Sequence, residues 1–178
     1  MRKELLGVLA ILIGVPLLSY AMYDLTQFQP RRAEIDAIVK HAAPPDRKPP
    51  EQVARMLKAL EPHGPSVYAS RLLARELSAF PTHERMLSWH IHSALWWSLV
   101  RLHLSEEEQT ALFLSLAPTG KEHRGFTSTA MAIYKRQPSD LSLDEIATIM
   151  ALIRQPTAQG ERLEHLRETL LAHYESGV

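Results

Sequence analysis

Two arginines, Arg71 and Arg75, stand four positions apart in a segment that we expect to be helical. That spacing places both guanidinium groups on one face of the helix, one turn apart. Guanidinium groups bind phosphate through paired, charge-assisted hydrogen bonds, so the two side chains could hold an anion. The other interpretation is that both arginines are solvated surface residues. The pair is therefore a weak candidate for a phosphate-binding site.

Four histidines, His83, His90, His92 and His103, fall along one long predicted helix. His90 and His92 are two positions apart, so their side chains point to different sides of that helix and are poorly placed to share one metal ion. We predict no metal site and no cofactor.

Three tryptophans and a valine form an apolar stripe on the same helix, at Trp89, Trp96, Trp97 and Val100. The stripe is interpreted first as core packing. The alternative, a surface against a membrane or a partner protein, rests mainly on Trp89, Trp96 and Trp97.

The composition excludes several classes of protein. The chain has 178 residues and no cysteine, which excludes disulfide scaffolds, thiol nucleophiles, Fe–S clusters and cysteine-based zinc sites. Lysine and arginine number 20, as do aspartate and glutamate. A zero formal charge argues against a nucleic-acid partner, because such proteins usually carry a basic excess.

The elements that position these residues are predicted to be helices throughout, so the fold class is all-α. Apolar residues recur at helical spacing, and no stretch alternates with the period of a strand. Ser105 with Glu108 and Ser142 with Glu145 form capping boxes, and Ser66 and Thr82 are predicted caps. In the long helix, the inward stripe is predicted to be Leu87, Ile91, Leu95, Leu99 and Leu102. The predicted helices cover residues 31–42, 50–60, 66–79, 82–104, 105–116, 126–134, 142–153 and 161–175.

The N-terminus predicts a membrane anchor over residues 1–23. Residues 5–23 carry no charge, which is close to the roughly 20 residues that a helix needs to cross a bilayer. Arg2 and Lys3 precede this run, so the N-terminus is expected in the cytoplasm. A cleaved signal peptide and a buried helix are the alternatives. Residues 24–50 then form a short helix and a stiff Pro-rich linker without helix over 43–50, and residues 51–178 form the main domain.

Several segments in order resemble the peptidoglycan glycosyltransferase domain of class A penicillin-binding proteins and monofunctional transglycosylases, and the two patterns align without a gap over residues 84–157. The resemblance implies a lysozyme-like helical fold behind an anchor in the bacterial inner membrane, with the body in the periplasm. The matching pieces are residues 84–88 (ERMLS, like E-R-T-L-S), 105–108 (SEEE, like S-K-D-E), Gly120 and Gly125 (the first and last Gly of Y-F-G-N-G-A-Y-G), 139–147 (SDLSLDEIA, like S-D-L-T-L-A-E-A-A) and 150–157 (MALIRQPT, like A-G-L-P-Q-A-P-S).

The sequence differs from the family's pattern at the positions where the family has its catalytic and substrate-binding residues. The family's early Glu, its general base, has no counterpart in residues 40–49. Its R-K-x-x-E motif falls on residues 89–93, where Trp89, His90 and Ser93 replace two cations and a carboxylate. Its Y-L-N asparagine falls on Ser115. Arg75 falls on a family lysine, so a residual anion site is possible there.

The sequence therefore predicts a membrane-anchored, catalytically inactive relative that binds a cell-wall partner protein or a lipid-linked glycan. No residue is assigned a catalytic role. The main alternative is an active glycosyltransferase in which Glu34, Asp36 or Asp46 has become the base. A lysozyme-like lytic activity is a third option that rests on fold alone.

Overall fold

The computed structural model describes residues 2–80, 86–120 and 123–177, with the side chains of residues 2–11 left out of the description. The described residues are helical, and their only β-type pairing is the bridge between Pro118 and Arg124, so the predicted all-α class is confirmed. In chain order the elements are α1 (Arg2–Tyr23), η1 (Asp24–Phe28), η2 (Gln29–Arg31), α2 (Arg32–His41), α3 (Pro44–Arg47), α4 (Glu51–Leu60), α5 (Ser66–Glu76), α6 (Met86–His103), α7 (Glu106–Leu116), α8 (Phe126–Ile133), η3 (Pro138–Asp140), α9 (Leu143–Arg154) and α10 (Glu161–Ser176).

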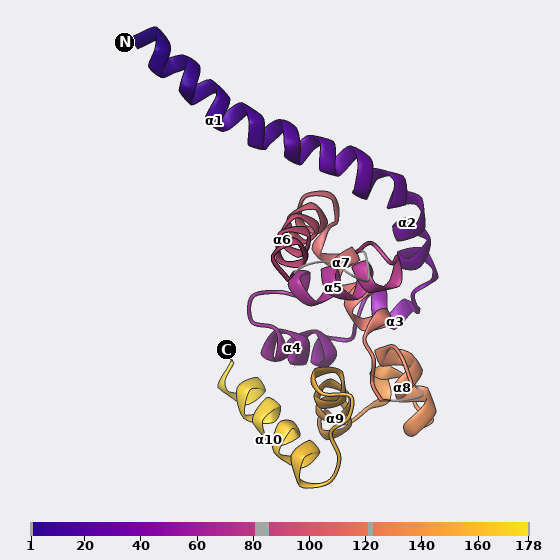
Figure 1. The fold of residues 1–178 in the computed structure, drawn as a ribbon. Coiled ribbons are helices and arrows are strands. Elements are labelled where there is room, and N and C mark those ends of the chain that lie inside the picture. The colour runs from indigo at the N-terminus through magenta and orange to yellow at the C-terminus, as the bar shows by residue number, and fades with distance from the viewer. Residues whose placement is uncertain (1, 81–85, 121–122, 178) are drawn as a thin grey trace.

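Helix α7 forms the centre of the body, because most of its side chains are buried. It packs against α5, α3, α2 and α8, while α5 also packs against α6. A second group, α4, α9 and α10, closes the other end of the body. Figure 1 shows this order, with α6, α7 and α5 together and α9 and α10 at the opposite end.

Both predicted capping boxes are present. The Ser105 hydroxyl accepts a hydrogen bond from the Glu108 amide, and the Glu108 carboxylate accepts one from the Ser105 amide at 2.7 Å. Ser142 and Glu145 repeat this arrangement at the start of α9. Each box satisfies two amides that the first turn of a helix leaves without partners.

The predicted cap at Ser66 is wrong, because Pro65 holds the capping position of α5 and the Ser66 hydroxyl instead accepts a hydrogen bond from Trp97 Nε1 at 3.0 Å. The cap predicted at Thr82 lies outside the described residues.

The prediction of a linker without helix over residues 43–50 is also wrong, because α3 lies inside it. Pro44 and Pro45 occupy the first turn of α3, where their missing N–H groups cost nothing. Asp46 is only 3% exposed, and its Oδ1 accepts hydrogen bonds from the Thr127 amide at 3.2 Å and hydroxyl at 2.6 Å. Asp46 therefore caps the first turn of α8 from outside that helix.

The inward stripe that we predicted for α6 is confirmed at Leu99 and is wrong at Leu87, Ile91 and Leu102, which are exposed. Trp96, Leu99 and Val100 are buried, whereas Leu87 and Leu102 are 73% and 64% exposed. The core interpretation of the tryptophan stripe is confirmed for Trp96, which packs against Phe28. A helix that is apolar on two sides gives no sequence signal for which side faces inward.

Helix α1 leaves the body as a single projecting helix, coloured indigo in Figure 1. Tyr20 and Tyr23 near its C-terminal end pack against the core. Among the residues that the structure describes, we find no helix with both the length and the apolar character that a membrane crossing requires. The anchor over residues 1–23 and the boundary at residue 50 stay predictions.

Candidate functional site

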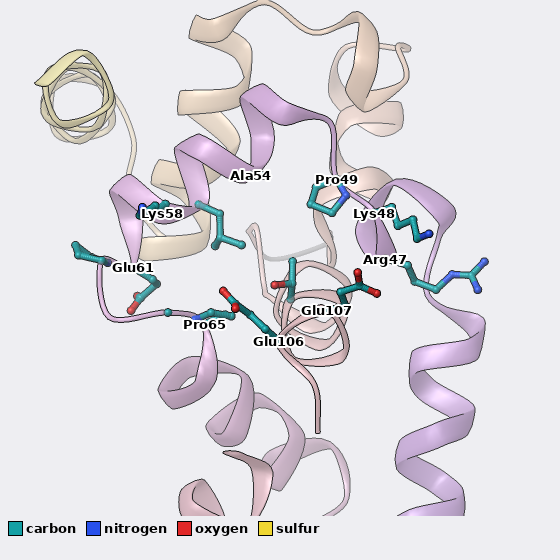
Figure 2. Close-up of a pocket in the computed structure, with 13 residues that line it drawn as sticks. Arg47, Lys48, Pro49, Ala54, Lys58, Glu61, Pro65, Glu106 and Glu107 are labelled. Carbon is teal, nitrogen blue, oxygen red and sulfur yellow. The ribbon is translucent and has the colours of Figure 1, made fainter. Parts of the chain in front are cut away.

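A groove of about 580 Å³ lies between α3, α4 and the N-terminal turn of α7. Figure 2 shows Glu106 and Glu107 reaching into it from α7, with Lys58 and Glu61 on one side and Lys48 and Arg47 on the other. Three cations thus face three carboxylates. A balanced lining of this kind suits a polar ligand that carries both signs of charge, such as a peptide segment, better than it suits a phosphate.

Glu61 is the groove residue with the most unusual surroundings. It follows α4 directly and is partly buried, and this burial raises the pKa of its carboxyl above the usual range. The nearby charges of Arg154, Arg71 and His63 oppose the rise without cancelling it. A carboxyl with a raised pKa in a groove is a candidate general base. Sequence reasoning missed Glu61, because it treated residues 61–65 only as a chain break.

Arg71 and Arg75 project from the exposed face of α5, as their spacing predicted. Tyr68 connects them, because its hydroxyl lies within electrostatic reach of both arginines and of Glu61. Burial, then the charge of Glu61, raises the pKa of that hydroxyl, which donates a hydrogen bond to the Ile153 carbonyl at 3.2 Å.

Arg75 also lines a hollow of about 310 Å³ together with Glu76, His123 and Arg124. Arg124 is held by an ion pair with Glu76 and by a hydrogen bond from its Nε to the Leu116 carbonyl at 3.1 Å. Gly125 has a φ of +85°, and a Cβ there would lie 2.9 Å from the Ser115 carbonyl oxygen. Only glycine permits that approach, and it places Arg124 at the hollow.

Arg71 and Arg154 lie within electrostatic reach of Glu61, and Arg75 and Arg124 line the hollow with Glu76. We call these four arginines the cationic face. Two carboxylates, Glu61 and Glu76, lie among the four arginines. Among these six described side chains, the arginines outnumber the carboxylates by two. Arg124 and Arg154 were not singled out in the sequence, because they stand far from Arg71 and Arg75 along the chain.

Four residues stand where the resembled family has catalytic or binding side chains, and they are scattered over the structure. Trp89 and His90 contact each other on the outer side of α6, with ring centroids 5.0 Å apart. The hydroxyls of Ser93 and Ser115 are buried and have no hydrogen-bond partner in the described part of the chain. Of these four residues, only Ser115 lies beside the cationic face, beneath Gly125.

The histidines of α6 make separate contacts. His103 Nε2 lies 3.0 Å from Asp24 Oδ2, and the His92 ring lies against the rings of Tyr23 and Phe80. Within residues 2–80, 86–120 and 123–177, no group of three His, Asp or Glu side chains is arranged to hold a metal. His83 lies outside the described residues.

The three carboxylates proposed as relocated bases are not brought together. Glu34 is exposed on α2, and Asp36 forms an ion pair with Arg32 at 2.9 Å. Asp46 is engaged by Thr127, and burial raises the pKa of its carboxyl despite both hydrogen bonds. Asp46 thus has a structural role in holding α8.

Comparisons with known proteins add no relative. No family model, no curated protein and no solved structure matches this chain.

Proposed function

We propose that this chain is a membrane-anchored binding protein without glycosyl-transfer chemistry of its own, and that its ligand is a lipid-linked glycan of the bacterial cell wall. The observation that carries the proposal is the cationic face of Arg71, Arg75, Arg124 and Arg154. Lipid-linked glycans carry phosphate groups, and arginine binds phosphate with two parallel hydrogen bonds.

Two further observations support the anchored, periplasmic part of the proposal. Helix α1 projects from the body and exposes apolar side chains on its described half, including Leu12 and Leu18. The resemblance to peptidoglycan glycosyltransferases supplies the inner membrane, the periplasm and the lysozyme-like fold as the expected context.

A cell-wall partner protein is the other ligand in this proposal. The groove between α3, α4 and α7 favours it, because Lys58 and Glu106 offer both signs of charge to a peptide.

The alternative is an active peptidoglycan glycosyltransferase, and Glu61 is the observation that favours it. A base must accept a proton near neutral pH, and burial moves the pKa of Glu61 in the required direction. Glu34 and Asp36 are exposed on α2, and Asp46, whose pKa burial also raises, is engaged by the Thr127 amide and hydroxyl.

One experiment separates these functions. Full-length protein in detergent is titrated with lipid-linked disaccharide and assayed in parallel for glycan polymer. The double variant Arg71→Gln/Arg75→Gln is expected to bind at least about tenfold more weakly, because one lost charged hydrogen bond costs about 1.5 kcal/mol. Arg162→Gln, on α10, is the matched control, since Arg162 is exposed and donates a hydrogen bond to Gln155.

Three results would change the assignment. Wild-type protein that fails to bind the lipid-linked disaccharide refutes the proposed ligand, and capture of a cell-wall protein by the same sample supports the partner instead. Polymer formation that is abolished by Glu61→Gln establishes the active alternative.

A further inference from the structure

The groove between α3, α4 and α7 continues at both ends beyond its central hollow. A second hollow of about 400 Å³ shares Lys48 and Glu107 with it and extends toward α2. A third hollow of about 470 Å³ shares Pro65 and Glu106 with it and extends toward α6. The three hollows therefore adjoin and form one groove around the first turn of α7. Its size suits an extended ligand of several units rather than a single ion.

Charges of opposite sign follow one another along this groove. Figure 2 shows Glu106 and Glu107 in its middle, with Lys58 to one side and Lys48 to the other. The adjoining hollows agree with this order, because Glu107 lines the hollow toward α2 together with Lys48, whereas Glu106 lines the hollow toward α6. The groove thus presents cations at both ends and two carboxylates between them.

The charged side chains in the middle and at the ends of the groove are not paired with one another. Four of them are exposed and form no ion pair and no side-chain hydrogen bond within residues 2–80, 86–120 and 123–177: Lys48, Lys58, Glu106 and Glu107. Nearby, by contrast, Arg32 pairs with Glu108 at 3.4 Å. Opposite charges in the groove thus stand too far apart to pair, so a ligand between them can contact both signs.

The α4 end of the groove meets the cationic face. Glu61 lines the groove and lies within electrostatic reach of Arg71 and Arg154. Together with Lys58, three cations stand around this one carboxylate, so this end of the groove favours a ligand carboxylate. A single molecule can therefore contact the groove and the cationic face together.

The order of the charges describes the ligand. An ammonium group fits between Glu106 and Glu107 in the middle, and carboxylates on either side of it fit Lys58 and Lys48. Phosphates and sugars carry no ammonium group, so neither uses the middle of the groove. The peptide of a bacterial lipid-linked glycan has the required order, because a residue with a side-chain amine stands between a glutamate carboxylate and the C-terminal carboxylate.

We infer that this groove binds a short peptide with an ammonium group between two carboxylates, as carried by a lipid-linked glycan. The inference rests on the proposed function, and it adds that the protein recognises the peptide of its ligand as well as the phosphates. A charged segment of a partner protein is the competing occupant.

The test uses full-length protein in detergent at low ionic strength and a soluble probe without phosphate, sugar or lipid. The probe is the peptide N-acetyl-L-Ala-γ-D-Glu-L-Lys-D-Ala-D-Ala, and isothermal titration calorimetry measures its binding. Glu106→Gln/Glu107→Gln removes both carboxylates from the middle of the groove. Glu161→Gln/Glu168→Gln on α10 is the matched control, because both glutamates are exposed and Glu161 also lies in the first turn of its helix.

The groove variant is expected to bind the probe at least about fivefold more weakly than wild type, because it loses exposed charge contacts, and the control about as tightly as wild type. Acetylation of the lysine side chain in the probe should weaken binding to wild type by a similar factor. It should not weaken binding to the groove variant further, because both changes remove the same contact. A merely structural effect of the variant would not produce this dependence on the probe.

Wild type that binds lipid-linked disaccharide but not the soluble probe overturns the inference and leaves the proposed function intact. Failure to bind either overturns both. Equal binding of the probe by wild type and the groove variant also overturns the inference, because the peptide then lies elsewhere. If the all-L peptide N-acetyl-Ala-Glu-Lys-Ala-Ala binds as tightly as the probe, the groove fits a protein segment and the inference is wrong.

Discussion

Removal of the Asp46 carboxylate is the sharpest test of how the segment before α4 is built into the body. Asp46→Ala leaves the Thr127 amide and hydroxyl without an acceptor in a buried place. Each unsatisfied buried donor costs about 1–3 kcal/mol, and relief from burying a carboxyl offsets part of that loss. We therefore expect Asp46→Ala to lower the free energy of unfolding by about 2 kcal/mol, which for a chain of this length lowers Tm by about 4–8 °C.

Asp46→Asn separates the hydrogen bonds from the charge. Its amide oxygen can still accept from Thr127, so it is expected to lose about 1 kcal/mol or less. Burial raises the pKa of Asp46 above its ordinary value of 3.8, so the folded state holds this proton more tightly than the unfolded state. The contribution of Asp46 to stability is therefore greatest below pH 3.8 and falls as the pH rises through the folded-state pKa. The asparagine variant does not titrate, so its free energy of unfolding should rise relative to wild type as the pH increases from 3.8 through the folded-state pKa of Asp46.

Urea unfolding followed by circular dichroism, repeated from pH 3.5 to 7, measures both effects at about 1 kcal/mol sensitivity. Asp140→Ala is the control, because Asp140 is exposed on η3 and its removal should stay within about 0.5 kcal/mol. Equal losses for the alanine and asparagine variants, with no pH dependence in the difference between wild type and Asp46→Asn, would refute the reasoning.

Three further predictions test the helices around the site by thermal unfolding. Gly125→Ala should cost about 1–3 kcal/mol, because φ is +85° and the new Cβ meets the Ser115 carbonyl, and an unchanged Tm contradicts this reading of the loop. Ser105→Ala should cost about 1 kcal/mol through loss of the α7 cap, and no loss would mean that the capping box adds nothing. Leu99→Ala should cost about 2–5 kcal/mol, whereas Leu87→Ala should stay within about 0.5 kcal/mol. A larger loss for Leu87→Ala than for Leu99→Ala would contradict this burial pattern.

Local signals in the sequence were enough to predict where α7 and α9 begin, because each starts with a capping box. Ser105 and Ser142 each carry a glutamate three residues later, so two helix starts follow from four residues that are close in the chain.

Features that depend on distant partners could not be predicted. Asp46 is buried because Thr127, 81 residues away, supplies its donors. The orientation of α6 was predicted only in part because both of its apolar stripes have helical spacing. Tertiary contacts, such as the packing of Phe28 and Phe80 against Trp96, select the side that faces inward.

In the candidate site too, features set by local helix geometry could be predicted and features set by tertiary contacts could not. The spacing of Arg71 and Arg75 was sufficient to place both on the exposed face of α5, because it depends only on helix geometry. Arg124 joins them through the turn at Gly125 and the ion pair with Glu76, which are tertiary contacts. The raised pKa of Glu61 likewise depends on burial that no local pattern signals.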